Sequence, residues 1–341
     1  MKRLVVLGGA ILALILIAAT FTALRFNDFL YTPVAVDDEG LEFEIVSGAS
    51  FGAVSDDLAK RGIIGHSGMF RLYARLTGQA GAIQAGDYRI KHGTTPAELL
   101  RQFTSGAVQL YSFTIVEGWN QWDLLKALHE HPQIDASLTD EDWPALLEEF
   151  GAVVRHPEGL FLPETYRFPR NTTDRDLLAQ AYQLMQAVLT EEWPARAGDA
   201  PLTTPYEALI LASIVEKETA RPDERQRIAG VFTRRLEKRM RLQTDPTVIY
   251  GIGSGFNGNL TRRDLQTDTP YNTYTRHGLP PTPIAFPGRA AINAALHPAD
   301  GPELYFVATG LGDGSHAFSA TKEQHDAAVA EYLKRLRRQR Q

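Results

Sequence analysis

Apolar residues fill the start of the chain without interruption. The stretch from Leu4 to Leu24 carries no charge, with Lys2 and Arg3 before it and Arg25 after it. At a rise of 1.5 Å per residue, this stretch makes a helix of roughly 31 Å, which matches the hydrocarbon core of a bilayer. The pattern therefore predicts a transmembrane helix. A cleaved signal peptide, whose apolar part is shorter, is the alternative.

A strand–turn–helix pattern then occurs three times, each centred on a glycine. The three glycines are Gly48, Gly93 and Gly118. Apolar residues alternate with polar ones before each glycine, as in a half-buried strand: Phe43 and Ile45, Tyr88 and Ile90, Phe113 and Ile115. An N-cap residue follows each glycine, and apolar residues four apart follow the cap. The predicted caps are Ser50, Thr95 and Asn120, and Gly62 and Gly106 are predicted to end the first two helices.

The first two copies, with a helix predicted for residues 69–76 between them, indicate a small α+β module over residues 41–112. It resembles LysM-like domains, which bind N-acetylated glycans; a stalk is the alternative. The third copy either completes this module or opens the next domain. The predicted order is a cytoplasmic N-terminus and transmembrane anchor (1–25), a spacer (26–40), the LysM-like module, a larger α+β domain (113–335) and a basic tail (336–341).

A helix predicted for residues 206–219 carries two glutamates in different settings. At 100° per residue, Leu211 and Val215 fall within about 60° of Glu218, whereas Glu216 falls about 160° away. Glu218 therefore lies on the apolar face, where burial raises the pKa of a carboxyl. A carboxyl that keeps its proton near neutral pH suits a general acid for glycosidic-bond cleavage. The alternative is an ordinary ion pair with Lys217, Arg221 or Arg225.

Ordered motifs cover nearly the whole chain. They occupy residues 158–166 (with Glu158 where Asp is also found), 213–219, 240–251, 271–275, 278–281, 287–288, 297–298 and 305–307. This set resembles the endolytic murein transglycosylase family (MltG, YceG-like). The resemblance implies that Glu218, the second glutamate of Glu-Lys-Glu-Thr, is the catalytic residue.

The resemblance also implies the reaction and its place. The bond is the β-1,4 link from N-acetylmuramic acid to N-acetylglucosamine in peptidoglycan, and the product is a 1,6-anhydro end formed without water. Glu218 would act as acid and then as base. The implied setting is nascent glycan strands at the inner membrane, beside the penicillin-binding synthases, where cutting terminates elongation. A glycan-binding scaffold that cuts nothing is the alternative, and a hydrolase of the same bond is a third reading.

Polar and aromatic side chains that follow the glutamate helix predict a glycan cleft. They are Gln243, Thr244, Asp245, Tyr250, Tyr271, Asn272 and Tyr274. The alternative is that Asp245 caps the next helix and the tyrosines belong to the core. Asp245 is also the candidate for a second carboxylate in the cleft. His316 is either a cleft residue or a structural one.

Composition narrows the remaining choices. The chain has no cysteine, and His129 and His131 lack the company of other zinc ligands, so we expect neither a metal nor a cofactor. A protein that binds nucleic acid usually carries a basic face, and a net charge of −6 gives no reason to expect one. No nucleic-acid partner is therefore expected. Two cations precede the apolar segment and one follows it, which favours a cytoplasmic N-terminus with the catalytic domain in the periplasm.

Overall fold

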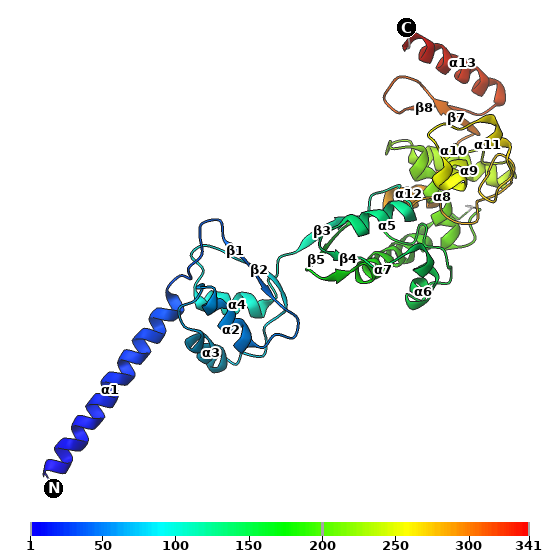
Figure 1. Ribbon diagram of the computed structural model, residues 1–341. Coiled ribbons are helices and arrows are strands. Elements are labelled where there is room, and N and C mark those ends of the chain that lie inside the picture. Colours follow the sequence, from blue (N-terminus) through cyan, green and yellow to red (C-terminus); the bar gives the residue numbers. More distant parts are fainter. Residues whose placement is uncertain (1, 199–200, 340–341) are drawn as a thin grey trace. The chain divides into compact units, whose positions relative to one another are not determined.

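The computed structural model describes residues 2–198 and 201–339, and the chain divides into two compact units (Figure 1). The first comprises residues 1–111 and 167–171, and the second comprises residues 112–166 and 172–341. Strands β3 (Tyr111–Thr114) and β5 (Thr165–Phe168) form a two-stranded sheet. The mixture of helices and small sheets agrees with the predicted α+β class. The LysM-like assignment and the domain limits stay predictions.

Helix α1 (Lys2–Tyr31) contains the predicted apolar segment. Among the described residues it is the one helix long and apolar enough to cross a membrane, over Gly9–Tyr31, and its apolar window is exposed. A signal sequence would meet the same criteria. The helix continues beyond Arg25, where the pattern predicts its end, because Phe29 packs against the core that follows. Val34 and Val36 are buried in that core, so the predicted spacer is part of the first unit.

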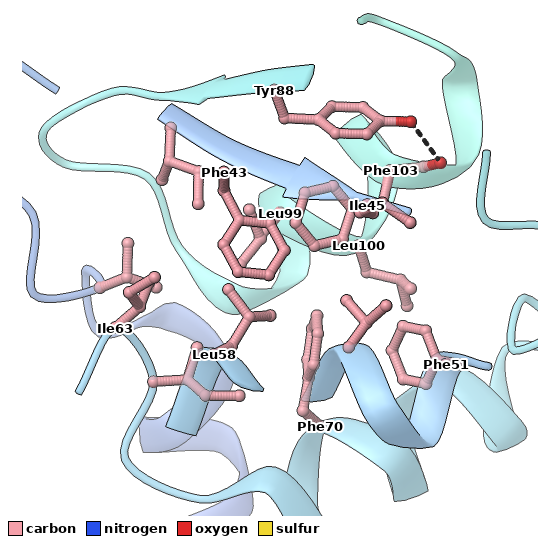
Figure 2. Packing of buried hydrophobic residues seen from close by; sticks show 14 of the residues in the cluster. Phe43, Ile45, Phe51, Leu58, Ile63, Phe70, Tyr88, Leu99, Leu100 and Phe103 are labelled. Carbon is pink, nitrogen blue, oxygen red and sulfur yellow. Dashed lines mark hydrogen bonds between the residues drawn. The ribbon is translucent and has the colours of Figure 1, made fainter. Parts of the chain in front are cut away.

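The core of the first unit lies between one antiparallel strand pair and three helices (Figure 2). Phe43 of the first strand is opposite Tyr88 of the second. Both side chains are buried, as the alternation predicts, and the ring of Phe103 packs against each of them, with centroids 5.9 Å from Phe43 and 4.8 Å from Tyr88. The elements are β1 (Leu41–Ile45), α2 (Phe51–Lys60), α3 (Ser67–Leu76), β2 (Gly86–Ile90) and α4 (Pro96–Ser105). The Tyr88 hydroxyl donates to the carbonyl of Gln84 at 2.7 Å, which satisfies its buried polar group.

The three predicted N-caps are confirmed. The side chains of Ser50, Thr95 and Asn120 each accept a backbone N–H in the first turn of α2, α4 and α5 (Gln121–Glu130). Gly106 is the C-cap of α4 in the left-handed conformation, at φ 71°, and Gly62 follows α2 at φ 74°. These local signals therefore set the helix boundaries as the sequence indicates.

The second unit is mostly helical (Figure 1). After α5 it contains β4 (Ile134–Asp135), α6 (Trp143–Glu149), β6 (Thr172–Thr173), α7 (Asp174–Glu192), α8 (Pro205–Glu218), α9 (Arg225–Glu237), α10 (Asp245–Ile252), α11 (Arg262–Gln266), α12 (Arg289–Leu296), β7 (Tyr305–Ala308), β8 (His316–Ser319) and α13 (Lys322–Gln339). Helix α8 packs against α9 and α12. The end of the predicted basic tail, residues 340–341, lies outside the described residues.

Helix α8 is buried all round, which corrects the single apolar stripe that the helical wheel predicts. Every residue from Ala208 to Val215 is buried. The cause is tertiary, because α9 and α12 both cover the helix. A completely covered helix can open a polar side chain to a cleft only where the covering stops. Glu218 is the last residue of α8 and so lies at such a position.

Candidate active site

Glu218 lies between two hollows in the second unit. We call the first the acidic hollow; it has a volume of about 510 Å³, and its lining includes Glu117, Trp119, Asp123, Glu216, Lys217 and Glu218. We call the second the aromatic hollow; it has a volume of about 460 Å³, and its lining includes Glu218, Arg235, Gln243, Thr244, Asp245, Tyr274, Tyr305, Phe306, Lys322 and His325. Glu218 is therefore a lining residue of both hollows.

The surroundings of Glu218 favour its protonated form. Desolvation raises the pKa of this carboxyl, and the negative charge of Asp245 raises it further. The Thr244 hydroxyl donates a hydrogen bond to Glu218 Oε1 and opposes the shift, as do the positive charges of His316 and Arg235. The net shift is upward, so the site combines a carboxyl that retains its proton with groups that stabilise its anion.

The structure gives no support to the alternative in which Glu218 pairs with Lys217, Arg221 or Arg225. Each of the three nearby cations has another partner. Lys217 Nζ donates to the carbonyl of Gly118 at 3.1 Å. Arg221 pairs with Asp223 at 2.7 Å, and Arg225 lies 3.7 Å from Glu216.

Four of the seven predicted cleft residues share the aromatic hollow with Glu218: Gln243, Thr244, Asp245 and Tyr274. Gln243 adopts a left-handed backbone at φ 51°, directly before the buried Thr244. The Tyr274 hydroxyl donates to Asp245 Oδ1 at 2.6 Å. The candidate second carboxylate and the candidate acid therefore line one hollow.

The structure does not place Tyr250, Tyr271 or Asn272 in the lining of either hollow. Asn272 is fully buried, and its amide nitrogen donates to the carbonyls of residues 264, 265 and 267, which holds its own loop together. The Tyr271 hydroxyl pairs with Thr282 at 2.8 Å. The rings of Tyr250 and Tyr271 pack edge to face at 4.9 Å. These contacts give the three residues structural roles in their own loop and helix.

His316, left open by the sequence, is held by a carboxylate and lies beside the site. Its Nδ1 is 2.7 Å from Glu224 Oε2, and its backbone N–H donates to Glu224 Oε1 at 2.9 Å. Its ring meets the edge of Phe306, which lines the aromatic hollow. Its charge also lowers the pKa of Glu218. These contacts support the structural interpretation of His316, which is not among the residues that line either hollow.

Two further buried glutamates were missed by the sequence reasoning. Glu158 is fully buried, and burial raises its pKa to about 8. Desolvation also raises the pKa of Glu216, whose carboxylate accepts the Gly288 N–H at 3.0 Å. The signal for Glu158 was the apolar run 160–162 directly after it. Burial of Glu216 follows from the packing of α9 and α12 around α8, which a wheel does not show.

The fold and the site define an α+β protein in which a desolvated carboxyl ends a helix that is buried from Ala208 to Val215, and this residue lines two hollows. Comparison with known proteins identifies the family to which the chain belongs. The model of the YceG-like family matches residues 43–331. The chain belongs to the YceG-like family.

The chain is similar to two curated relatives. One is the endolytic murein transglycosylase of Bacillus subtilis strain 168, at 31% identity over 91% of this chain and 90% of that protein. The other is the endolytic murein transglycosylase of Streptococcus pneumoniae D39, at 28% identity over 85% of this chain, which spans 58% of that longer relative. A solved structure of a YceG-like protein from Listeria monocytogenes is 26% identical, with a TM-score of 0.49 over 85% of this chain and 99% of that one.

Proposed function

We propose that this protein is a membrane-anchored, endolytic peptidoglycan lytic transglycosylase with Glu218 as its catalytic acid and base. The observation that carries the proposal is the position of Glu218, which lines both hollows while its carboxyl favours the protonated form. A glycan strand that extends on both sides of the acid is cut internally. The names of the Bacillus and Streptococcus relatives support the same activity.

The reaction uses one proton twice. Glu218 donates its proton to the oxygen between N-acetylmuramic acid and N-acetylglucosamine, and the bond from that oxygen to muramoyl C1 breaks. The Glu218 carboxylate then takes the proton of the muramoyl C6 hydroxyl while the oxygen of that hydroxyl bonds to C1. The products are a 1,6-anhydro end and a free 4-hydroxyl, and the carboxyl is restored. The balance closes without water.

The site contains groups suited to both stages. Desolvation and the charge of Asp245 favour the proton on Glu218 before transfer. The Thr244 hydroxyl and the guanidinium of Arg235 stabilise the carboxylate that remains afterwards. The positive charge that develops at C1 is stabilised either by Asp245 or by the substrate's own N-acetyl group. Asp245 shares the aromatic hollow with Glu218, which favours the former.

The exposed apolar part of α1 supports a single-pass anchor in the inner membrane, with the second unit in the periplasm. An anchored enzyme reaches only glycan close to the bilayer. We therefore place its action on nascent strands, where an internal cut terminates elongation beside the penicillin-binding synthases.

The test is digestion of unlabelled glycan strands by the full chain in detergent, with the products weighed by mass spectrometry. The proposal expects fragments whose masses add up to that of the substrate, with anhydro ends. Fragments heavier by one water in total would identify a hydrolase and overturn the lytic reaction.

A scaffold that only binds glycan is distinguished by the same assay. It would release no fragments, and Glu218→Gln would leave its binding unchanged. For the proposed enzyme, Glu218→Gln abolishes release, whereas the matched control Glu164→Gln, at an exposed carboxyl of the same unit, does not.

A further inference from the structure

A second buried carboxyl, outside both hollows, connects two of the helices that form them. Glu158 Oε2 accepts the backbone N–H of Gln121 at 3.2 Å and the hydroxyl of Tyr250 at 2.9 Å. Gln121 is the first residue of α5, and Tyr250 belongs to α10. One oxygen atom thus holds two segments that are remote in sequence.

Each connection leads to a different hollow. Trp119 and Asp123, on either side of Gln121, line the acidic hollow. Thr244 and Asp245, at the start of α10, line the aromatic hollow, and Thr244 also donates to Glu218. The two elements that Glu158 joins therefore carry lining residues of two different hollows, both of which include Glu218.

We propose that Glu158 is a positioning residue of the active site, whose carboxyl holds the start of α5 and helix α10 together and so keeps the two hollows aligned on Glu218. The inference rests on the proposed function for its kinetic consequence but not for its structural one. A ring contact reinforces the connection, because Trp122 of α5 packs against Tyr250 with ring centroids 5.5 Å apart.

Burial favours the neutral form of Glu158, although its two hydrogen bonds act in the opposite direction and lower its pKa. Both donors reach Oε2, and Oε1 is buried without a hydrogen-bond partner among the described residues. A carboxylate would leave negative charge on that unpartnered atom, at a high desolvation cost. The charges that face the group are Asp123, which raises its pKa, and Lys217, which lowers it, after burial as the main cause.

The segment around Glu158 has little freedom to adjust. Gly159 has φ +78°, and a Cβ at this position would lie 2.5 Å from Pro283. The Glu158 N–H faces His156 Nδ1 at 3.3 Å. The packing of this backbone segment therefore fixes the position at which the Glu158 carboxyl accepts its two hydrogen bonds.

The first test compares variants of the full chain in detergent by amide hydrogen exchange and by kinetics. Glu158→Ala leaves two donors without an acceptor, so protection of residues 118–125 and 244–251 should fall about tenfold to a hundredfold. The value of kcat/KM should fall at least about tenfold, mainly through kcat, because misaligned hollows impair the transition state more than binding. Glu158→Gln, a neutral isostere, should restore both, and the control Glu164→Gln should change neither.

Tyr250→Phe gives a second test that does not depend on the folding of the alanine variant. It removes one of the two connections, so protection should fall at 244–251 and remain at 118–125. Unchanged protection in both segments of Glu158→Ala would overturn the inference. Reduced protection with unchanged kcat/KM would overturn the positioning role while the proposed function stands.

The pH dependence provides a third test, in the Glu218→Gln background so that the catalytic acid does not titrate. The pKa of Glu158 is raised from 4.5 to about 8, so its contribution to stability is fully present below 4.5 and is lost as the pH rises through about 8. Protection factors at 118–125 should therefore fall between about pH 4.5 and about pH 8 and change little above it. The same loss in Glu158→Gln, which has no proton to release, would contradict the neutral connection.

Discussion

Asp87 in the first unit and Glu158 in the second are both buried carboxyls that accept a hydrogen bond from a tyrosine hydroxyl. They differ in their other partner. Asp87 accepts from Tyr111 at 2.8 Å and is also bonded to the guanidinium of Arg170. Glu158 accepts from Tyr250 and from a neutral backbone N–H. One buried carboxyl has a cation at contact distance, and the other has neutral donors.

The difference separates structural from functional burial. A cation compensates a buried carboxylate and fixes its charge, so the group serves the fold. Where no cation pairs with the carboxyl, desolvation disfavours the charged form and raises the pKa. Glu218 belongs with Glu158, because desolvation is the main cause of its raised pKa as well. The proton on Glu218 should therefore matter for activity, and the charge on Asp87 for stability.

The largest effect is expected at Glu218. Glu218→Gln removes the transferable proton, so kcat should fall by about 10² to 10⁴. The free energy of unfolding should not fall with it, since a neutral amide avoids the desolvation cost of the carboxylate. Rates of anhydro-end formation and chemical denaturation measure the two quantities. Equal losses of activity and stability would place Glu218 among the structural carboxyls.

Alanine substitutions at two glycines with left-handed backbone, one in each unit, compare how tightly the units pack around them. Gly159→Ala adds both backbone strain and a collision with Pro283, so we expect a loss of about 2 to 4 kcal/mol. Gly48→Ala, at φ +79° with open space around it, should cost only the strain, about 1 to 2 kcal/mol. Denaturant titration measures both. Equal losses of unfolding free energy in the two variants would show that the segment around Glu158 adjusts more readily than its contacts indicate.

Asp87→Asn tests the structural carboxyl. The change weakens the acceptor of the Tyr111 hydroxyl, and we expect the free energy of unfolding to fall by about 1 to 3 kcal/mol. The kcat of the folded protein should be unchanged, because Asp87 belongs to the first unit. A drop in kcat without a drop in stability would reverse the assignment.

The smallest effects are opposite shifts of the pH profile, measured in the Glu158→Gln background. Glu218 is active when protonated, so activity is lost as the pH rises through its pKa. Thr244→Val removes a donor that lowers this pKa and should move the alkaline limb to higher pH. Asp245→Asn removes a charge that raises it and should move the limb to lower pH. Shifts of the same sign would mean that the limb reports another group.

Local features were predictable from the sequence, and distant partners were not. Ser50, Thr95 and Asn120 cap their own helices, so their role depends on residues two or three positions away. Glu158 meets partners 37 and 92 residues away, which no periodicity reveals. Glu216 fell on the far side of the wheel, yet the packing of α9 and α12 buries it as well.

The seven predicted cleft residues divide along the same line. Gln243, Thr244 and Asp245 adjoin the start of α10, and they line the hollow beside Glu218. Asn272 has the side-chain chemistry of a sugar-binding residue, but its amide is occupied by its own loop. Residue type alone did not distinguish a donor for ligand from a donor for backbone.

The way α1 enters the first unit has a mechanical consequence. Val34 and Val36 are seated in that unit's core only a few residues after the helix ends at Tyr31. Under the proposed membrane anchoring, a load on the first unit would reach α1 through this core, with little slack chain between the two. The packing strength of the core would then limit the load that the proposed anchor can carry.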